Sequence, residues 1–150
     1  SYKRLRVSES ASGTTWSPVW KTLGDNNRTC LLRAVSGRLE WRLPDPSCNV
    51  YAALAATIAA GLDGIEQAMP APAICDDDLY ELHAKQSTKM PDRLPSHLLD
   101  AVEALAQNES LRSQLGDSFC QQLIEIKRQE WDEYAEQISQ WELQTYCDRF

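Results

Sequence analysis

The sequence predicts an α+β fold in which helix dominates. Two short strand-like segments flank a glycine-containing turn near position 36, which is the pattern of an antiparallel hairpin. An alanine-rich, almost wholly apolar segment follows, and two later segments repeat apolar residues at intervals of three and four. The predicted order is therefore loop, hairpin, buried helix, irregular crossing and two amphipathic helices.

The N-terminal part is predicted to hold the loop and the hairpin. Residues 8–27 carry Gly, Ser, Thr, Pro and Asn at turn-forming density around Trp16 and Trp20. We therefore expect a long loop there. Residues 28–35 and 38–43 are the two predicted strands, and we expect them to pair antiparallel.

A buried helix is predicted over residues 49–65, with Asn49 as its N-cap. Because this segment is apolar almost all round, we expect the rest of the fold to cover it. Gly61 and Gly64 each lower helix propensity by about 1 kcal/mol relative to Ala. We expect them to mark close packing or an approaching helix end.

The C-terminal half is predicted to begin as an irregular connection and to continue as two helices. Residues 69–95 contain four prolines, and we expect one turn near residues 79–82. Ser96 is the predicted cap of a helix that ends near Gln107, and a longer helix is predicted from Asp117 to Trp141. The apolar face of the longer helix would contain Cys120, Ile124, Trp131, Tyr134, Ile138 and Trp141.

Composition limits the classes of partner. The net charge of -7 and the pI of 4.8 argue against a nucleic-acid surface, although more than half of the 15 Lys and Arg residues fall in the first 42 positions. Five cysteines without paired spacing predict neither a disulfide framework nor a zinc site, and a reducing cytoplasm is expected. The longest apolar run is about 13 residues, short of the roughly 18 that span a bilayer, so no membrane partner is expected. The first residue is Ser, and we expect a longer chain to precede it.

The second predicted strand carries charge on one face. If residues 38–43 are extended, Arg38, Glu40 and Arg42 share one face, and the apolar residues Leu39, Trp41 and Leu43 share the other, which would face a core. Such a row of charges is often a simple surface ladder worth a few tenths of a kcal/mol. Arginines on the neighbouring strand, Arg28 and Arg33, favour a different hypothesis. Four guanidinium groups around one carboxylate suit a polyanion with a divalent cation.

These residues resemble the glutamine synthetase family. The resemblance is carried by the strings SYKRL (1–5), NNRT (26–29) followed by Arg33, RLEWRLPDPSCNVY (38–51), AAGLDGI (59–65) and, more loosely, WELQTYCDRF (141–150). It implies the C-terminal portion of the catalytic domain, with a flap loop at 1–27, a catalytic hairpin at 28–43 and a mostly helical part at 49–150. It further implies ATP and Mg²⁺ or Mn²⁺ as cofactors.

The resemblance also implies a role for each residue that matches a family motif. Arg4 would bind the substrate glutamate, and Arg42 would bind glutamate or the acyl phosphate. Arg28 and Arg33 would face the nucleotide phosphates, with Arg28 and Arg42 acting in catalysis. Along the second strand, Arg38 would lie near the nucleotide and Glu40 would be a metal ligand.

Two departures from the family pattern stand out. Where the family has a flap glutamate that handles ammonium, this chain has GTTWSP, which places Trp16 at the position of the acid; Glu9, in the same loop, could substitute if the loop folds back. A flap of this kind resembles the type III-like branch, which includes methylamine ligases, although loop packing would also explain the tryptophan. Tyr80 matches a tyrosine that some bacterial members adenylylate, but the residues after it do not match. His83 and His97 have no ligand partner at i+4 and are predicted to be surface residues.

The expected function is ATP-dependent ligation of ammonia to the γ-carboxylate of glutamate through γ-glutamyl phosphate. An alternative is a γ-glutamyl-alkylamide ligase, and a second alternative is a non-catalytic structural or regulatory domain. The family resemblance implies a homo-oligomer whose active site is shared between subunits. These 150 residues alone are expected to be inactive.

Overall fold

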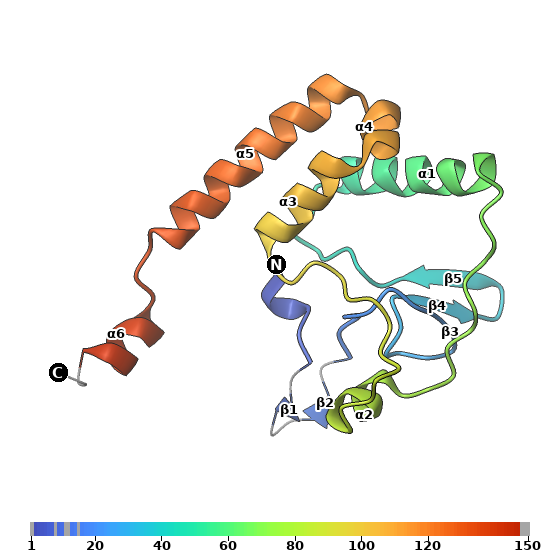
Figure 1. Ribbon diagram of the computed structural model, residues 1–150, viewed down its shortest axis with the longest axis horizontal. Coiled ribbons are helices and arrows are strands. Elements are labelled where there is room, and N and C mark those ends of the chain that lie inside the picture. The colour runs from blue at the N-terminus through green and yellow to red at the C-terminus, as the bar shows by residue number, and fades with distance from the viewer. Residues whose placement is uncertain (1, 8, 11–12, 15, 148–150) are drawn as a thin grey trace. The chain divides into compact units, whose positions relative to one another are not determined.

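The computed structural model describes residues 2–7, 9–10, 13–14 and 16–147, which form two compact units over residues 1–97 and 98–150 (Figure 1). The first unit begins with the 3-10 helix η1 (Tyr2–Arg4) and a pair of two-residue strands, β1 (Glu9–Ser10) and β2 (Gly13–Thr14). A three-stranded sheet follows, made of β3 (Leu23–Asp25), β4 (Leu32–Val35) and β5 (Arg38–Trp41). Its order is β3-β4-β5.

The predicted hairpin is confirmed. Strands β4 and β5 pair antiparallel, with Val35 opposite Arg38 across the two-residue turn. Gly37 in that turn has φ +78°, a left-handed conformation that a glycine adopts without the steric cost of a side chain. The alternation expected along β5 is also present, because Glu40 lies opposite Arg33 and Leu39 lies opposite Ala34.

One two-stranded sheet and one strand of a second sheet lie inside the segment that the sequence predicted to be a long loop. The first is the antiparallel pair β1–β2, and the second includes β3, which pairs parallel to β4. A remote contact adds to the pairing of β3 with β4, because the Leu23 carbonyl accepts a hydrogen bond from the Cys75 amide at 2.8 Å. Gly24 allows the close approach, since a Cβ there would lie 2.6 Å from Asn27 Cβ and 2.7 Å from Cys30 Sγ. The pure-loop prediction was wrong here: β1 and β2 pair locally, and β3 pairs with β4 and with the remote segment around Ile74 and Cys75.

The core of the first unit lies between the segment after β2 and the helix α2 (Leu79–Ala84). Its buried residues are Val19, Trp20, Cys30 and Leu79. The single turn expected near residues 79–82 is thus confirmed as α2, with Asp78 capping its first amides. The remaining connection from 69 to 95 is irregular apart from two isolated bridges that join Ile74 to Leu23 and Arg93 to Trp20.

Helix α1 (Val50–Glu66) begins as predicted, with the Asn49 side chain accepting from the Ala52 amide at 3.2 Å. The expectation that it is buried was wrong for this chain. Tyr51 is 87% exposed and Ile58 is 62% exposed. The cause is that, within the described residues, no helix or strand packs extensively along α1. For the same reason Gly61 has open space around it; Gly64, two residues from the last helical residue, marks the helix end.

The second unit is helical, with α3 (Leu98–Gln107), α4 (Glu109–Leu115), α5 (Asp117–Ala135) and α6 (Gln140–Tyr146). Val102, Cys120 and Ile124 are buried where α3 and α5 pack. The single long helix predicted from Asp117 to Trp141 was wrong. It breaks after Ala135, and a capping box formed by Ser139 and Glu142 starts α6. The distal part of the predicted apolar face is accordingly exposed, with Ile138 at 73% and Trp141 at 62%.

None of the helices in the part of the chain that the structure describes is long and apolar enough to cross a membrane.

Candidate active site

The site is built around Glu40 on β5, which both strands of the hairpin supply with arginine partners. Arg33 on β4 lies directly opposite, and its Nη1 donates to Glu40 Oε2 at 2.9 Å. Arg38, two residues before Glu40 on the same strand face, donates from Nη2 to Oε1 at 2.9 Å. These hydrogen bonds, Arg38's first and then Arg33's, hold the pKa of the Glu40 carboxyl below its usual value. The carboxylate is therefore charged at neutral pH.

The other face of β5 does not form a core within this chain, which corrects the expectation from the alternating pattern. Leu39 is 58% exposed and Trp41 is 37% exposed. The alternation was predicted correctly, but burial of the apolar face needs a second layer. Among the described residues the one element that packs extensively against β5 is its hairpin partner β4.

Arg42 follows β5 and binds backbone carbonyls. Its Nη1 donates to the carbonyls of Arg28 and, at 3.1 Å, Cys30, while its Nη2 donates to the carbonyl of Trp16 at 2.7 Å. Burial lowers the pKa of the Arg42 guanidinium, and the nearby positive charge of Arg33 lowers it further. Arg42 thus joins the N-terminal segment, the loop before β4 and the end of β5.

The loop between β3 and β4 is fixed by Asn27. Its Nδ2 donates to the carbonyls of Cys75 at 3.0 Å and Asp77 at 2.9 Å, and its Oδ1 accepts from the Thr29 amide and hydroxyl. Thr29 Oγ1 in turn accepts from the Leu79 amide at the start of α2. This side-chain network holds Arg28, which is exposed, beside the hairpin.

Arg33 has spare hydrogen-bonding capacity. Its Nη1 binds Glu40 and its Nη2 binds the side-chain oxygen of Asn26, but its Nε is buried and has no hydrogen-bond partner among the described residues. A buried donor without a partner costs about 1–3 kcal/mol, so a bound anion that accepts from it would remove that cost. The residues present therefore fit a phosphate-bearing ligand.

The hairpin offers a metal ion one carboxylate ligand, Glu40. In the described part of the chain no group of three or more His, Cys, Asp or Glu side chains could hold a metal. Glu40 has the chemistry of an Mg²⁺ ligand, but Mg²⁺ needs further oxygen ligands that this hairpin does not supply.

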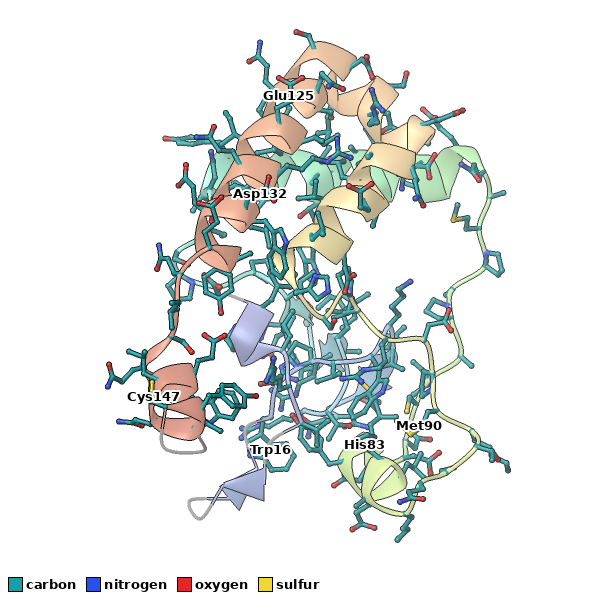
Figure 2. The ribbon with its side chains drawn as sticks, turned by 60° about the vertical axis from the view of Figure 1, so that its left-hand side comes forward. Trp16, His83, Met90, Glu125, Asp132 and Cys147 are labelled. Carbon is teal, nitrogen blue, oxygen red and sulfur yellow. The ribbon has the colours of Figure 1, made fainter. Side chains whose placement is uncertain are left out.

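The predicted flap residue Trp16 lies beside α2. Its backbone is in the left-handed region, at φ +54°, and its side chain is 43% exposed. Its ring lies 6.4 Å from that of Tyr80, and Figure 2 labels Trp16 and, on α2, His83. The other flap candidate, Glu9, has its backbone in β1, but its side chain lies outside the described residues.

Arg4 is joined to the same region through its side chain and its backbone. Its Nη2 donates to the Leu43 carbonyl just after β5, and its own carbonyl accepts from Ser17 Oγ. The structure therefore gathers Arg4, Trp16 and Arg42 at the end of β5, and Arg33, Arg38 and Glu40 along the hairpin face.

Sequence reasoning missed two residues that organise the site. Asn27 was seen only as part of a motif, although an Asn two positions before a Thr is a known turn former whose side chain can bind the backbone. Tyr80 was noted for another reason, and its hydroxyl donates to the Ser17 carbonyl at 2.8 Å. His83 is exposed as expected and packs on Trp20 at 5.7 Å, while His97 is half-buried.

The hairpin gathers guanidinium donors of the kind that can bind phosphate, and comparison with known proteins identifies the family of the chain. The model of the glutamine synthetase catalytic domain matches residues 1–146. The chain belongs to the glutamine synthetase family.

Relatives of two activities match the whole chain. It is 42% identical over 151 residues to a glutamate–methylamine ligase of Methyloversatilis universalis, covering 100% of this chain and 34% of the relative. It is 43% identical over 157 residues to a glutamine synthetase of Halobacterium salinarum, covering 100% of this chain and 33% of the relative. The chain thus spans about a third of the length of these curated relatives.

Solved structures of GmaS have the same fold over nearly all of this chain. The ligand-free form matches with a TM-score of 0.79 at 39% identity, covering 98% of this chain and 32% of that one. A complex of GmaS with ADP matches with a TM-score of 0.82 at 38% identity, covering 96% and 34%.

Proposed function

We propose that this chain forms part of an ATP-dependent ligase that joins a small amine to the γ-carboxylate of L-glutamate. The activity belongs to a longer protein, since relatives are about three times as long. The observation that carries the proposal is the Arg33–Glu40–Arg38 arrangement, with its unpartnered buried Nε, on the hairpin of a glutamine synthetase family member.

The nucleotide phosphates are assigned to Arg28, Arg33 and Arg38. Arg28 is exposed on a fixed loop, and the Arg33 Nε is a donor in need of an acceptor. Guanidinium groups bind phosphate through paired, charge-assisted hydrogen bonds. The ADP complex of a structural neighbour supports a nucleotide as the ligand.

Glu40 is assigned as one ligand of Mg²⁺ or Mn²⁺, with the remaining ligands supplied by the rest of the protein. Both carboxylate oxygens of Glu40 accept hydrogen bonds from arginines, so a bound metal ion would displace one of the two arginines. Arg38 is the partner more easily displaced, because its side chain is 69% exposed and that of Arg33 is 16% exposed. When bound, the metal would neutralise charge on the transferred phosphoryl group.

Glutamate and its acyl phosphate are assigned to Arg4 and Arg42 at the end of β5. The γ-carboxylate oxygen attacks the terminal phosphorus of ATP and ADP leaves. The unprotonated amine then attacks the acyl carbon, inorganic phosphate leaves, and the amine nitrogen releases one proton to solvent. Arg28 and Arg42 stabilise the charge that develops on the phosphoryl oxygens in both steps. The flap over residues 1–27 would exclude water from the acyl phosphate.

We place methylamine ahead of ammonia as the amine, which reverses the order expected from the sequence. Trp16 provides an apolar wall where an acid would attract ammonium, and a methyl group in such a pocket is worth about 1–3 kcal/mol. The methylamine ligase relative and the GmaS structures support this choice. Ammonia has the support of the glutamine synthetase relatives.

The test is phosphate release by the full-length protein with ATP, Mg²⁺ and glutamate, comparing methylamine, ethylamine and ammonium. We expect release to depend on glutamate and an amine, with a higher kcat/KM for methylamine than for ammonium. A higher kcat/KM for ammonium would overturn the choice of amine but would still support the proposed ligase activity. No amine-dependent release would overturn the ligase and favour the structural or regulatory alternative.

A homo-oligomer with a shared active site would show recovered activity when two differently inactivated subunits are mixed.

A further inference from the structure

Tyr80 on α2 connects the buried core to the flap tryptophan. Its ring lies 5.9 Å from the buried Trp20 in an edge-on arrangement with an interplanar angle of 84°, and 6.4 Å from the ring of Trp16. Trp20 is 1% exposed, so one neighbour of Tyr80 is fixed in the core while the other, Trp16, is 43% exposed. The three rings form a continuous aromatic contact from the core to the surface.

The Tyr80 hydroxyl also holds the backbone next to Trp16. It donates to the Ser17 carbonyl at 2.8 Å, and the Ser17 hydroxyl donates to the Arg4 carbonyl. On the preceding residue, Arg42 donates to the Trp16 carbonyl at 2.7 Å. A bulky residue at φ +54° adopts a conformation that is costly by itself, so the surrounding contacts must keep it there.

These contacts differ in what they could do during a reaction. Arg4 and Arg42 are assigned to glutamate, so their hold on residues 16 and 17 can change when substrate binds. Tyr80 has no assigned substrate contact, and its ring also packs on Trp20, which is fixed in the core. Tyr80 is therefore the contact that can fix the indole of Trp16 independently of the substrates.

We propose that Tyr80 is a positioning residue for amine selection: its ring and hydroxyl set the place of the Trp16 indole, which in turn sets the size and polarity of the amine that is accepted. The proposal rests on the proposed function for its link to the amine. The positioning itself is a property of the described contacts and can be measured without turnover.

Two substitutions in the full-length protein separate the contacts. Tyr80→Phe keeps the ring and removes the hydrogen bond to Ser17, whereas Tyr80→Leu removes both. We expect Tyr80→Leu to raise the KM for methylamine about tenfold while the KM values for ATP and glutamate change by less than about twofold. Tyr80→Phe should lie between Tyr80→Leu and the unaltered protein.

The matched control is Glu81→Gln on the same helix, because the Glu81 side chain pairs with Lys85 at the surface. This variant should retain all three KM values. A Tyr80→Leu protein whose KM for methylamine is unchanged, or in which all three KM values rise together, would overturn the proposal in favour of a purely structural tyrosine.

Hydrogen exchange without substrates gives a readout that does not depend on activity. In Tyr80→Phe and Tyr80→Leu, the amides of Trp16, Ser17, Val19 and Trp20 should exchange faster, and those of β4 and β5 should be unchanged. Unaltered exchange at Trp16 and Ser17 would overturn the positioning role. Faster exchange in a protein that shows no amine-dependent phosphate release would uphold the positioning and refute the ligase instead.

Discussion

Glu40 and Arg33 lie directly opposite each other on antiparallel strands and are joined by an ion pair of 2.9 Å. Arg38 binds the second oxygen of the same carboxylate. A simple surface ladder of charges would consist of one acid between two cations, without a buried donor that lacks a partner. Here the buried Nε of Arg33 still lacks a partner among the described residues, and this feature favours a ligand site over a ladder.

Replacing Glu40 by Gln should abolish most turnover and leave the protein folded. The amide keeps the shape of the side chain but cannot serve as an anionic metal ligand. We expect kcat to fall at least about a hundredfold, the order seen when one group that stabilises a transition state is removed. Steady-state kinetics over a range of Mg²⁺ concentrations would measure this, with Glu103→Gln in the second unit as a control. Near-normal activity with unchanged Mg²⁺ dependence would refute the metal assignment.

The stability contributed by Glu40 should depend on pH in one direction. Its folded-state pKa is lowered by Arg38 and Arg33, so the folded state favours the charged carboxylate. The contribution is fully present above the unfolded-state pKa of about 4.3 and is lost as the pH falls through the lower folded-state value. The difference in Tm between the unaltered protein and Glu40→Gln should therefore be constant above about pH 5 and should shrink in more acidic buffer. A difference that grows on acidification would contradict the ion-pair geometry.

Arg42→Lys should be far from conservative. One planar guanidinium serves the carbonyls of Arg28, Cys30 and Trp16 at once, and a lysine ammonium cannot span them. We expect kcat/KM for glutamate to fall on the order of tenfold to a thousandfold, or about 1.4–4 kcal/mol. Arg128→Lys is a suitable control, because Arg128 forms an exposed pair with Glu103. Unchanged kinetic constants for glutamate would refute the assignment of Arg42 to the glutamate site.

Trp16→Glu should shift selectivity toward ammonium. A carboxylate attracts NH₄⁺ and removes the apolar wall that accepts a methyl group. The ratio of kcat/KM for methylamine to that for ammonium should fall about tenfold or more. Trp16→Gln separates the two effects, since it removes the indole without adding charge. If the ratio is the same in Trp16→Glu and in the unaltered protein, residue 16 does not select the amine.

The sequence predicted those features whose causes lie within a few residues. The hairpin, its alternation and the Asn49 cap follow from local geometry, and the meeting of Arg33, Arg38 and Glu40 follows from the alternation. The capping box formed by Ser139 and Glu142 is equally local but was not recognised, so the predicted helix extended beyond the end of α5 at Ala135.

Features that depend on distant partners could not be predicted. Strand β3 depends on Cys75, and the carbonyl contacts of Arg42 depend on how two loops approach it. Burial of α1 was wrong for a different reason: an apolar sequence shows that a surface needs cover, but not whether the cover belongs to the same chain. The roles assigned to the arginines and to Glu40 stay predictions until the substitutions are made.

The Asn27 amide joins two segments, because its NH₂ group binds the carbonyls of Cys75 and Asp77 while its oxygen binds Thr29 in its own loop. Hydrolysis of that one amide to a carboxylate would leave an acceptor facing two carbonyl oxygens, with no donor between them. Spontaneous deamidation, a slow chemical reaction of ageing proteins, would thus release the loop that holds Arg28 without altering any charged residue of the site. The lifetime of this loop would then depend on how well the fold shields a neutral side chain from water.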